Sequence, residues 1–324
     1  MTLIPPKIKS IAVLQLGKLG DMILTTPLFN SIKELYPESN LTVIADDNSG
    51  IIAKVHPSVD HVISIQNGIM RIPNIISALK YKKYDLYIDH KNHFSRTSQM
   101  AAWFIKSQLI IIHHLNQPNN NGNYINLPKT IPPGHYVDIA TTPLTILNKE
   151  YKFNRQPQIF ISNEIQKSID SRISIDKLGL IVINISAGSS DRMWTEENWK
   201  ALIKSLSKKY SIGIISDPKD TTLANRLCSV QKNCRIIRTE NILEAAAVIK
   251  RSLIVISSDT SIVHISSAFN KPCLALFSYD ISNVNCFKPM SLKSKVVISK
   301  KGYKICDIEF EEVLEKFYEI EKQL

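Results

Sequence analysis

Short apolar runs alternate with segments of helical periodicity along the chain, and this alternation occurs twice within the 324 residues. Short continuous apolar runs are typical of strands that are buried on both faces of a parallel sheet. In the first half, we expect strands at residues 11–16, 41–45, 62–65, 86–88 and 109–113. In the second half, we expect strands at residues 180–185, 211–215, 235–238, 253–256 and 273–277. Helices between successive strands predict two parallel sheets, each covered on both faces.

The helices follow from apolar residues at a spacing of three and four. We expect them at residues 21–36, 75–81, 98–105, 135–147, 196–208, 221–229, 242–250, 262–269 and 310–321. Residues 116–134 contain Asn, Gly and four prolines, which predicts a long loop. A polar passage at residues 148–157 separates the two halves, so we expect domains at residues 1–155 and 156–324. The predicted fold class is α/β, with two Rossmann-like domains facing an interdomain cleft.

Composition narrows the class of partner. Hydrophobic residues make up 44% and charged residues 21% of the chain, which excludes disordered and fibrous proteins. The net charge of +11 favours acidic partners such as nucleic acid, phosphorylated substrates or an anionic membrane surface. No RNA-binding, zinc-finger or basic-zipper motif occurs, so we expect no nucleic-acid partner.

The sequence also bears on location. The five cysteines form no C-x-x-C pair, which favours a reducing, cytoplasmic compartment. No apolar run approaches 18 residues and no signal peptide is recognisable, so we expect membrane contact to be at most peripheral.

The first of three polar loops that follow strands reads Gly17-Lys18-Leu19-Gly20-Asp21. It lacks the third glycine of the dinucleotide fingerprint, although the acidic pair Asp46 and Asp47 ends the next strand, where a ribose-binding acid would lie. Asp21 occupies the helix N-terminus on which a pyrophosphate would rest, and two anions ~4 Å apart repel by about 4 kcal/mol at an effective dielectric near 20. The Asp21 carboxylate could accept a proton from a neutral nucleophile or could cap the helix, and the residues alone leave both open.

The second loop, residues 186–194, predicts an anion-binding site. Its small residues let backbone amides approach an anion, Ser189 and Ser190 offer hydroxyl groups, and Arg192 can fork onto phosphate oxygens. Thr195 is placed to cap the helix that follows.

The third loop, residues 257–264, again combines hydroxyl groups with a helix N-terminus. Asp259 could accept hydrogen bonds from sugar hydroxyls or cap the helix, and His264 is more readily interpreted as a packed core residue. His90 and His93 are expected to be solvated, and Trp194 and Trp199 to pack against helices. No metal-binding motif is present, so we expect neither a metal site nor a cofactor.

Taken in order, these segments resemble glycosyltransferase family 9, the ADP-heptose lipopolysaccharide heptosyltransferases. The resemblance covers almost the whole chain and rests on Gly17-x-x-Gly20-Asp21, Thr26-Pro27, residues 184–188, Arg192-Met193-Trp194, residues 259–264 and residues 268–272. It implies a GT-B fold with an acceptor-binding amino domain and a nucleotide-sugar-binding carboxy domain. It also implies an inverting, metal-independent transfer of heptose from ADP-heptose to a hydroxyl of a phosphorylated lipopolysaccharide core acceptor.

The resemblance assigns roles to individual residues. Asp21 matches the general base, Arg192 matches a basic residue on the donor diphosphate, and Lys18 is interpreted as facing an anionic acceptor. The donor-binding residues that it implies are Ser186, Gly188, Ser189, Arg192, Asp220, Ile242, Asp259, Thr260, Ser261 and His264. Asp220 and Ile242 match positions near ribose and adenine only loosely.

The chain also departs from the family. Ser261 stands where members often have glycine, and residues 185–188 stand where they often have His-Pro-Gly, so the identity of the sugar stays open. We therefore keep a different sugar donor or a nucleotide-sugar epimerase as alternatives within the same fold. An NAD-dependent oxidoreductase and a catalytically silent nucleotide-sugar-binding protein are the alternatives from other classes.

Overall fold

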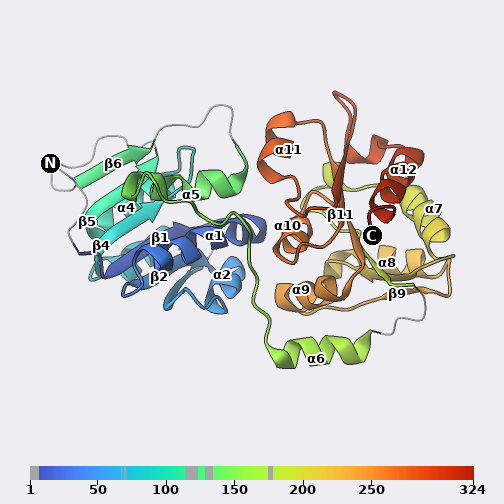
Figure 1. Cartoon of the computed structure of the whole chain (residues 1–324), viewed down its shortest axis with the longest axis horizontal. Coiled ribbons are helices and arrows are strands. Elements are labelled where there is room, and N and C mark those ends of the chain that lie inside the picture. The colour runs from blue at the N-terminus through green and yellow to red at the C-terminus, as the bar shows by residue number, and fades with distance from the viewer. Residues whose placement is uncertain (1–6, 67, 69–70, 114–122, 128–133, 174–177) are drawn as a thin grey trace. The chain divides into compact units, whose positions relative to one another are not determined.

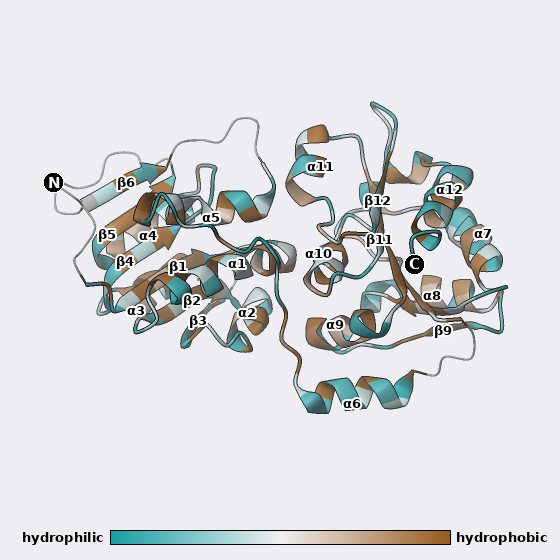
Figure 2. Cartoon of the chain, viewed as in Figure 1, coloured by the Kyte–Doolittle hydropathy of each residue, from teal (hydrophilic) through white to brown (hydrophobic). Residues whose placement is uncertain are grey.

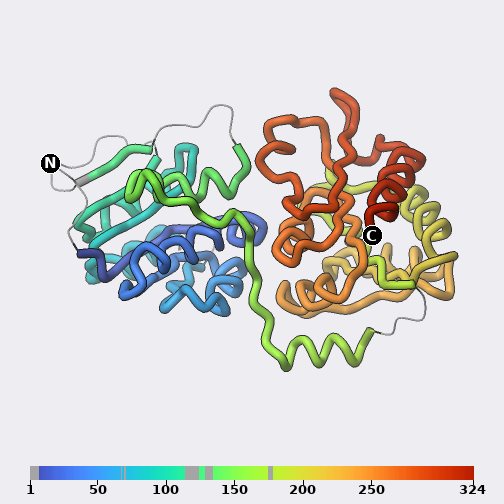
Figure 3. The backbone as a smooth tube through the Cα atoms, in the orientation of Figure 1, coloured from blue at the N-terminus to red at the C-terminus, as the bar shows by residue number. Residues whose placement is uncertain are grey.

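The computed structural model describes residues 7–66, 68, 71–113, 123–127, 134–173 and 178–324. The chain divides into two compact units, Met1–Pro157 and Gln158–Leu324, where the sequence predicted domains at residues 1–155 and 156–324. Figures 1 and 3 show the chain passing from the first unit into the second between α5 and α6. None of the helices in the described ranges is long and apolar enough to cross a lipid bilayer.

The first unit is a six-stranded parallel sheet in the order β3-β2-β1-β4-β5-β6. Its strands are β1 (Ser10–Gln15), β2 (Asn40–Asp46), β3 (His61–Ile65), β4 (Lys83–Asp89), β5 (Lys106–His113) and β6 (Asn123–Leu127). Its helices are α1 (Leu19–Leu35), α2 (Asp47–Lys54), α3 (Arg71–Leu79), α4 (Arg96–Phe104) and α5 (Tyr136–Leu147). One core joins alternate side chains of the strands, such as Leu14, to Ile75 of α3 and Ala101 of α4, so these two helices cover one face.

The second unit repeats the plan with the strand order β12-β11-β10-β7-β8-β9, again parallel. Its strands are β7 (Leu180–Asn184), β8 (Ser211–Ile215), β9 (Cys234–Ile236), β10 (Ile254–Ser258), β11 (Cys273–Phe277) and β12 (Ser294–Ile298). Its helices are α6 (Asn163–Arg172), α7 (Glu196–Leu206), α8 (Thr221–Cys228), α9 (Ile242–Arg251), α10 (Ser261–Ala268), α11 (Ile281–Phe287) and α12 (Phe310–Glu321). Figure 2 shows the apolar residues concentrated in the strands and the inner sides of the helices.

The core of the second unit contains both tryptophans, as predicted. Trp194 and Trp199 are buried, with ring centroids 4.8 Å apart at an interplanar angle of 86°. The indole Nε1 of Trp194 donates to Ile308 O at 2.8 Å, which fastens the start of α7 to the segment before α12. Thr195 caps α7 through its side chain, which accepts from Asn198 N, and this prediction is also confirmed.

The prediction that residues 116–134 form a continuous loop was wrong, because Asn123–Leu127 form β6 and pair in parallel with β5. An edge strand bonds to one neighbour only, so it needs little of the apolar character that marks a central strand. Four further elements, α2, α6, α11 and β12, were also not predicted. The three helices are short or largely solvated. Strand β12 lies at an edge of the second sheet and has one fully buried residue, Val297.

The strand order determines where ligands can bind. In each sheet, strand order reverses between two neighbours: β1 and β4 in the first unit, β7 and β10 in the second. Open α/β sheets bind ligands at the carboxyl ends of the strands at such a switch point. Each of the three polar loops follows one of these strands: the first follows β1, the second β7 and the third β10.

Candidate active site

Asp21 lies at the switch point of the first unit, in the first turn of α1. The residue preceding α1 is Lys18, which is exposed, so Asp21 is not the N-cap of this helix. A Cβ atom placed on Gly17 would lie 3.2 Å from Asp21 Oδ2, which shows that the carboxylate rests directly over this glycine. Because Gly17 has no side chain, the Asp21 carboxylate can lie against its Cα atom.

Asp46 holds the same loop from the neighbouring strand β2. Its carboxylate accepts a hydrogen bond from the Gly17 backbone N–H and pairs with Arg71 Nη2 at 2.8 Å. Burial raises the pKa of Asp46 above its ordinary value, while Arg71 and the Gly17 N–H act in the opposite direction. Asp46, which could have bound a ribose in a dehydrogenase, thus stabilises the loop that precedes Asp21.

Two buried titratable side chains lie at the end of β4, across the switch point. His90 Nε2 is 3.4 Å from Thr25 Oγ1, and the Thr25 hydroxyl donates to Asp21 O at 2.8 Å. The His90 ring also packs edge-on against Tyr136. Burial lowers the pKa of His90 to about 3, so its imidazole is neutral at physiological pH.

The prediction that His90 is solvated was therefore wrong, whereas His93 is exposed. The sequence around His90 is polar, but its position directly after an apolar strand was a signal of burial. Its neighbour Asp89 is buried as well, and burial raises the pKa of that carboxyl to about 6.

In the second unit, Arg192 and Asp259 come together at the switch point between β7 and β10. Arg192 Nη1 lies 3.0 Å from Asp259 Oδ2 and 3.4 Å from Asp259 O. Asn283 of α11 donates from Nδ2 to the same carboxylate oxygen at 3.0 Å. The Asp259 side chain is 8% exposed and that of Arg192 is 34% exposed, so the guanidinium remains accessible to a ligand.

Asn184, the last residue of β7, holds the two loops together. Its Nδ2 lies 3.0 Å from Ser186 O, 3.0 Å from Ser257 Oγ and 3.2 Å from Thr260 Oγ1. Ser186 Oγ in turn accepts from Asp217 N at 2.8 Å, which ties the loop after β7 to the loop after β8. The sequence interpretation assigned no role to Asn184 or Asn283, although an amide at the end of an otherwise apolar strand was a visible signal.

The remaining predicted residues of the third loop form the start of α10. Thr260 caps this helix by accepting from Ile262 N at 3.3 Å, so the alternative in which Asp259 caps it was wrong. Ser261 is the first residue of the helix. His264 is buried, as its interpretation as a core residue predicted, and its ring centroid lies 6.0 Å from that of Phe287.

The second loop also contains Gly188 and Ser189, which are exposed. Nothing lies within 4 Å of a Cβ atom placed on Gly188, so this glycine faces open space. Lys219, which the sequence interpretation did not single out, donates from Nζ to Ala187 O at 3.2 Å. It therefore adds a second cation beside this loop.

Asp220 and Ile242 lie further along the same carboxyl edge. Asp220 precedes α8, and its Oδ2 atom is buried without a hydrogen-bond partner among the described residues. Ile242 is the first residue of α9, after the edge strand β9. Since adjacent strands are about 4.8 Å apart, the loops after β10, β7, β8 and β9 form a row that suits an elongated ligand.

The described part of the chain contains no group of three or more His, Cys, Asp or Glu side chains arranged to hold a metal ion. The two switch points thus offer a carboxylate beside a glycine turn in one unit and a guanidinium with hydroxyl groups in the other. These are groups for accepting a proton and for binding an anion.

Comparison with known proteins identifies relatives of the chain. The family model of glycosyltransferase family 9 (heptosyltransferase) matches residues 72–316. Lipopolysaccharide heptosyltransferase 3 of Escherichia coli is 22% identical over 275 residues, which is 80% of this chain and 80% of that protein. A family 9 glycosyl transferase from Veillonella parvula DSM 2008 has a similar structure, with a TM-score of 0.85 at 18% identity over 100% of this chain and 99% of that one. E. coli heptosyltransferase WaaC with ADP-2-deoxy-2-fluoro heptose matches at a TM-score of 0.72 and 16% identity, covering 97% and 100%.

Proposed function

The chain belongs to glycosyltransferase family 9, and from this premise we propose that it transfers a heptose from ADP-heptose to a hydroxyl of a lipopolysaccharide core acceptor. It is a glycosyltransferase with the two-unit GT-B fold of its relatives. Relatives named as lipopolysaccharide heptosyltransferases, and one whose structure contains an ADP-heptose analogue, support this choice of donor and acceptor.

The observation that carries the proposal is the convergence of Arg192, Asp259 and the start of α10 at the switch point of the second unit. When the glycosidic bond breaks, the departing nucleoside diphosphate gathers negative charge. Arg192, with the hydroxyl groups of Ser186 and Ser189, is placed to bind those oxygens, and Gly188 lets backbone amides approach. We propose that these groups and Lys219 stabilise the leaving group, so that the transfer needs no metal.

The rest of the row accounts for the nucleoside and the sugar. The Asp220 oxygen that has no hydrogen-bond partner in the described part of the chain suits a ribose hydroxyl, and Ile242 provides an apolar surface for adenine. Asp259 would accept hydrogen bonds from the sugar, while Thr260, Ser261 and His264 build the helix start against which the diphosphate rests. These assignments make the second unit, predicted from the sequence as residues 156–324, the donor-binding domain.

The first unit, predicted from the sequence as residues 1–155, would bind the acceptor. Asp21 would take the proton of the acceptor hydroxyl as that oxygen attacks the anomeric carbon from the side opposite the diphosphate, which inverts the configuration. The neutral imidazole of His90 contacts the Thr25 hydroxyl, which donates to the Asp21 backbone carbonyl, and so helps to hold the first turn of α1. Lys18, exposed beside Asp21, suits a phosphorylated acceptor.

A nucleotide panel measured by calorimetry tests the donor. We expect ADP-heptose and ADP to bind, and UDP-sugars, GDP-sugars and NAD to bind at least tenfold more weakly. Preference for NAD or for a UDP-sugar over ADP-heptose would contradict the proposed donor.

We also propose a peripheral contact with the cytoplasmic face of the inner membrane, through the amino-terminal edge of the first sheet. Exposed lysines gather there, and Lys83 and Lys106 are direct partners in the register of β4 and β5. The exposed lysines of this edge are Lys7, Lys9, Lys80, Lys82, Lys83 and Lys106. Exposed aromatic side chains accompany them: Tyr81 at 81%, Trp103 at 54% and Phe104 at 40%. Lysines with Trp and Tyr are the side chains that favour an anionic lipid interface.

The geometry of the sheet suits such a contact. The seven residues of β4 separate this edge from the carboxyl edge by about 23 Å at roughly 3.3 Å per residue. With the amino-terminal edge on the membrane, this distance leaves room for the oligosaccharide of a lipid-anchored acceptor to reach Asp21 at the carboxyl edge.

Tryptophan fluorescence offers a direct test of the membrane contact, because Trp194 and Trp199 are buried and Trp103 is exposed. We expect vesicles containing anionic lipid to shift the emission to the blue and to protect it from acrylamide, with no effect in Trp103→Leu. Equal binding to neutral and anionic vesicles, or no binding to either, would contradict this contact.

A further inference from the structure

Loop 238–241, the last four residues of the connection between β9 and α9, lies at the edge of the second sheet where the proposed row of donor-binding loops ends. It leads directly into α9, which Asn241 caps by accepting from Leu243 N at 3.0 Å and Glu244 N at 3.1 Å. Ile242, the residue proposed to contact adenine, follows immediately. The position of this loop therefore determines where a base can lie.

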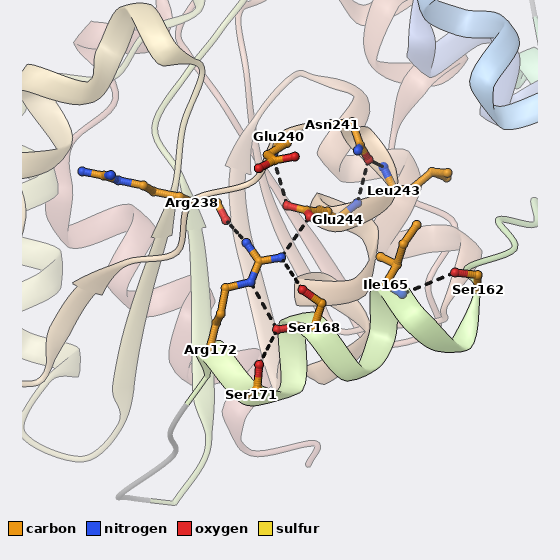
Figure 4. Close-up of polar contacts among 10 residues, drawn as sticks. All are labelled: Ser162, Ile165, Ser168, Ser171, Arg172, Arg238, Glu240, Asn241, Leu243 and Glu244. Atoms are coloured by element: carbon orange, nitrogen blue, oxygen red, sulfur yellow. Dashed lines mark hydrogen bonds and ion pairs between the residues drawn. The ribbon is translucent and has the colours of Figure 1, made fainter.

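Arg172, the last residue of α6, reaches this loop from a different part of the sequence (Figure 4). Its Nη1 donates to Arg238 O at 3.3 Å, and its Nη2 donates to Glu244 Oε1 at 2.9 Å. The same guanidinium is itself anchored on its own helix, to Ser168 O at 3.2 Å and Ser168 Oγ at 3.1 Å. Figure 4 also shows the Arg238 side chain pointing away from this cluster, so it is the backbone of Arg238 that is held.

Glu244 completes the set of contacts. Its second carboxylate oxygen accepts from Glu240 N at 3.0 Å, so one side chain holds the middle of the loop and pairs with Arg172. Burial raises the pKa of Glu244, but Arg172 and the Glu240 N–H together keep it below its ordinary value. The carboxylate is therefore ionised at neutral pH, and the loop is held at residues 238, 240 and 241.

We propose that Arg172 and Glu244 are positioning residues that fix loop 238–241 for recognition of the adenine base of the donor. The proposal rests on the function proposed above. An apolar side chain such as Ile242 can pack against any base, because every base has an apolar face. Discrimination between bases then requires polar backbone groups in fixed positions, and a loop that is already ordered loses less entropy when it binds.

The chain offers a matched control for this idea. Arg251 of α9 pairs with Asp170 of α6 at 3.1 Å, with side-chain exposures of 51% and 39%. This ion pair joins the same two helices as Arg172 and Glu244 do, but within the described residues neither of its side chains forms a hydrogen bond or ion pair with loop 238–241. Arg251→Ala therefore removes a link between α6 and α9 without releasing the loop.

The experiment measures the dissociation constants of ADP, UDP and inorganic pyrophosphate by calorimetry for the full chain, for Arg172→Ala and for Arg251→Ala. We expect Arg172→Ala to weaken ADP binding roughly tenfold, since it removes charged hydrogen bonds. Pyrophosphate binding should stay within about twofold, because the diphosphate loops are untouched, and the preference for ADP over UDP should fall. Arg251→Ala should change none of these values.

Three outcomes would overturn the proposal: unchanged ADP affinity in Arg172→Ala, an equal loss for ADP and pyrophosphate, or an equal loss of ADP affinity in Arg251→Ala. If Arg172→Ala does not fold, Arg172→Lys and Glu244→Gln take its place, and both should lower the ADP-to-UDP preference without changing pyrophosphate affinity. Failure of the wild-type chain to bind ADP would instead overturn the proposed function, whatever Arg172 does.

Discussion

Replacement of Arg192 by alanine is expected to weaken ADP binding by one to two orders of magnitude. Arg192 is 34% exposed and pairs with Asp259, so its guanidinium is fixed on one side and open to a ligand on the other. A hydrogen bond to a charged group contributes roughly 1.5–3 kcal/mol, and each 1.4 kcal/mol corresponds to about tenfold in affinity. The expected loss is therefore about 10- to 150-fold.

The assay is calorimetric titration with ADP, and two further variants sharpen it. Arg192→Lys keeps the charge but cannot fork onto two oxygens, so its affinity should fall between those of the wild type and Arg192→Ala. Asp191→Ala serves as the control, because Asp191 lies in the same short turn as Arg192 and forms an ion pair with Lys304. Both side chains of this pair are exposed, Asp191 at 61% and Lys304 at 60%, so the pair should contribute little. Unchanged ADP affinity in Arg192→Ala, or an equal loss in Asp191→Ala, would refute the assignment of Arg192 to the diphosphate.

Three further predictions concern neighbouring residues. Gly17→Ala places a Cβ atom 3.2 Å from Asp21 Oδ2, so the rate of heptose transfer should fall at least tenfold while ADP affinity stays constant. Normal turnover would contradict the placement of Asp21 as the base. Asn283→Ala removes a hydrogen-bond donor from Asp259, so the KM for ADP-heptose should rise roughly tenfold, while the affinity for ADP should change much less. An equal change in both values would argue against a contact between Asp259 and the sugar. Asp89 has its pKa raised to about 6, so the stability linked to its protonated form is complete below pH 4 and is lost as the pH rises through 6. Asp89→Asn should therefore be more stable than wild type at pH 7.5, by up to about 3 kcal/mol in denaturant unfolding. The difference in the free energy of unfolding should vanish near pH 4. A difference that stays constant with pH would exclude the buried Asp89 carboxylate as its cause.

The sequence predicted most of the fold because central parallel strands and amphipathic helices leave strong local patterns. The helix of residues 310–321 and the strands of residues 211–215 and 273–277 were predicted to the residue. The edge strands β6 and β12 and the solvated helix α6 leave weak patterns, which is why they were not predicted. In α6, only Ile169 is buried, so its sequence carries almost no apolar stripe.

The candidate site was predictable where its chemistry is local. The glycine turn before Asp21 and the polar loop containing Arg192 each lie within one short segment. Their supporting contacts are not local: Asn283 lies 24 residues from Asp259, and Glu244 lies 72 residues from Arg172. His90 shows the same limit, because its burial under Tyr136 depends on the strand order and not on its polar neighbours.

The measurement that tests the central claim most directly is the turnover of Asp21→Asn with ADP-heptose and a lipopolysaccharide core acceptor, made together with its ADP affinity. If Asp21 accepts the proton of the acceptor, turnover should fall about 10²- to 10⁴-fold, while ADP affinity stays within twofold of wild type. Turnover within a few-fold of wild type would contradict the role of Asp21, and a parallel loss of ADP affinity would contradict the separation of base and donor site between the two units.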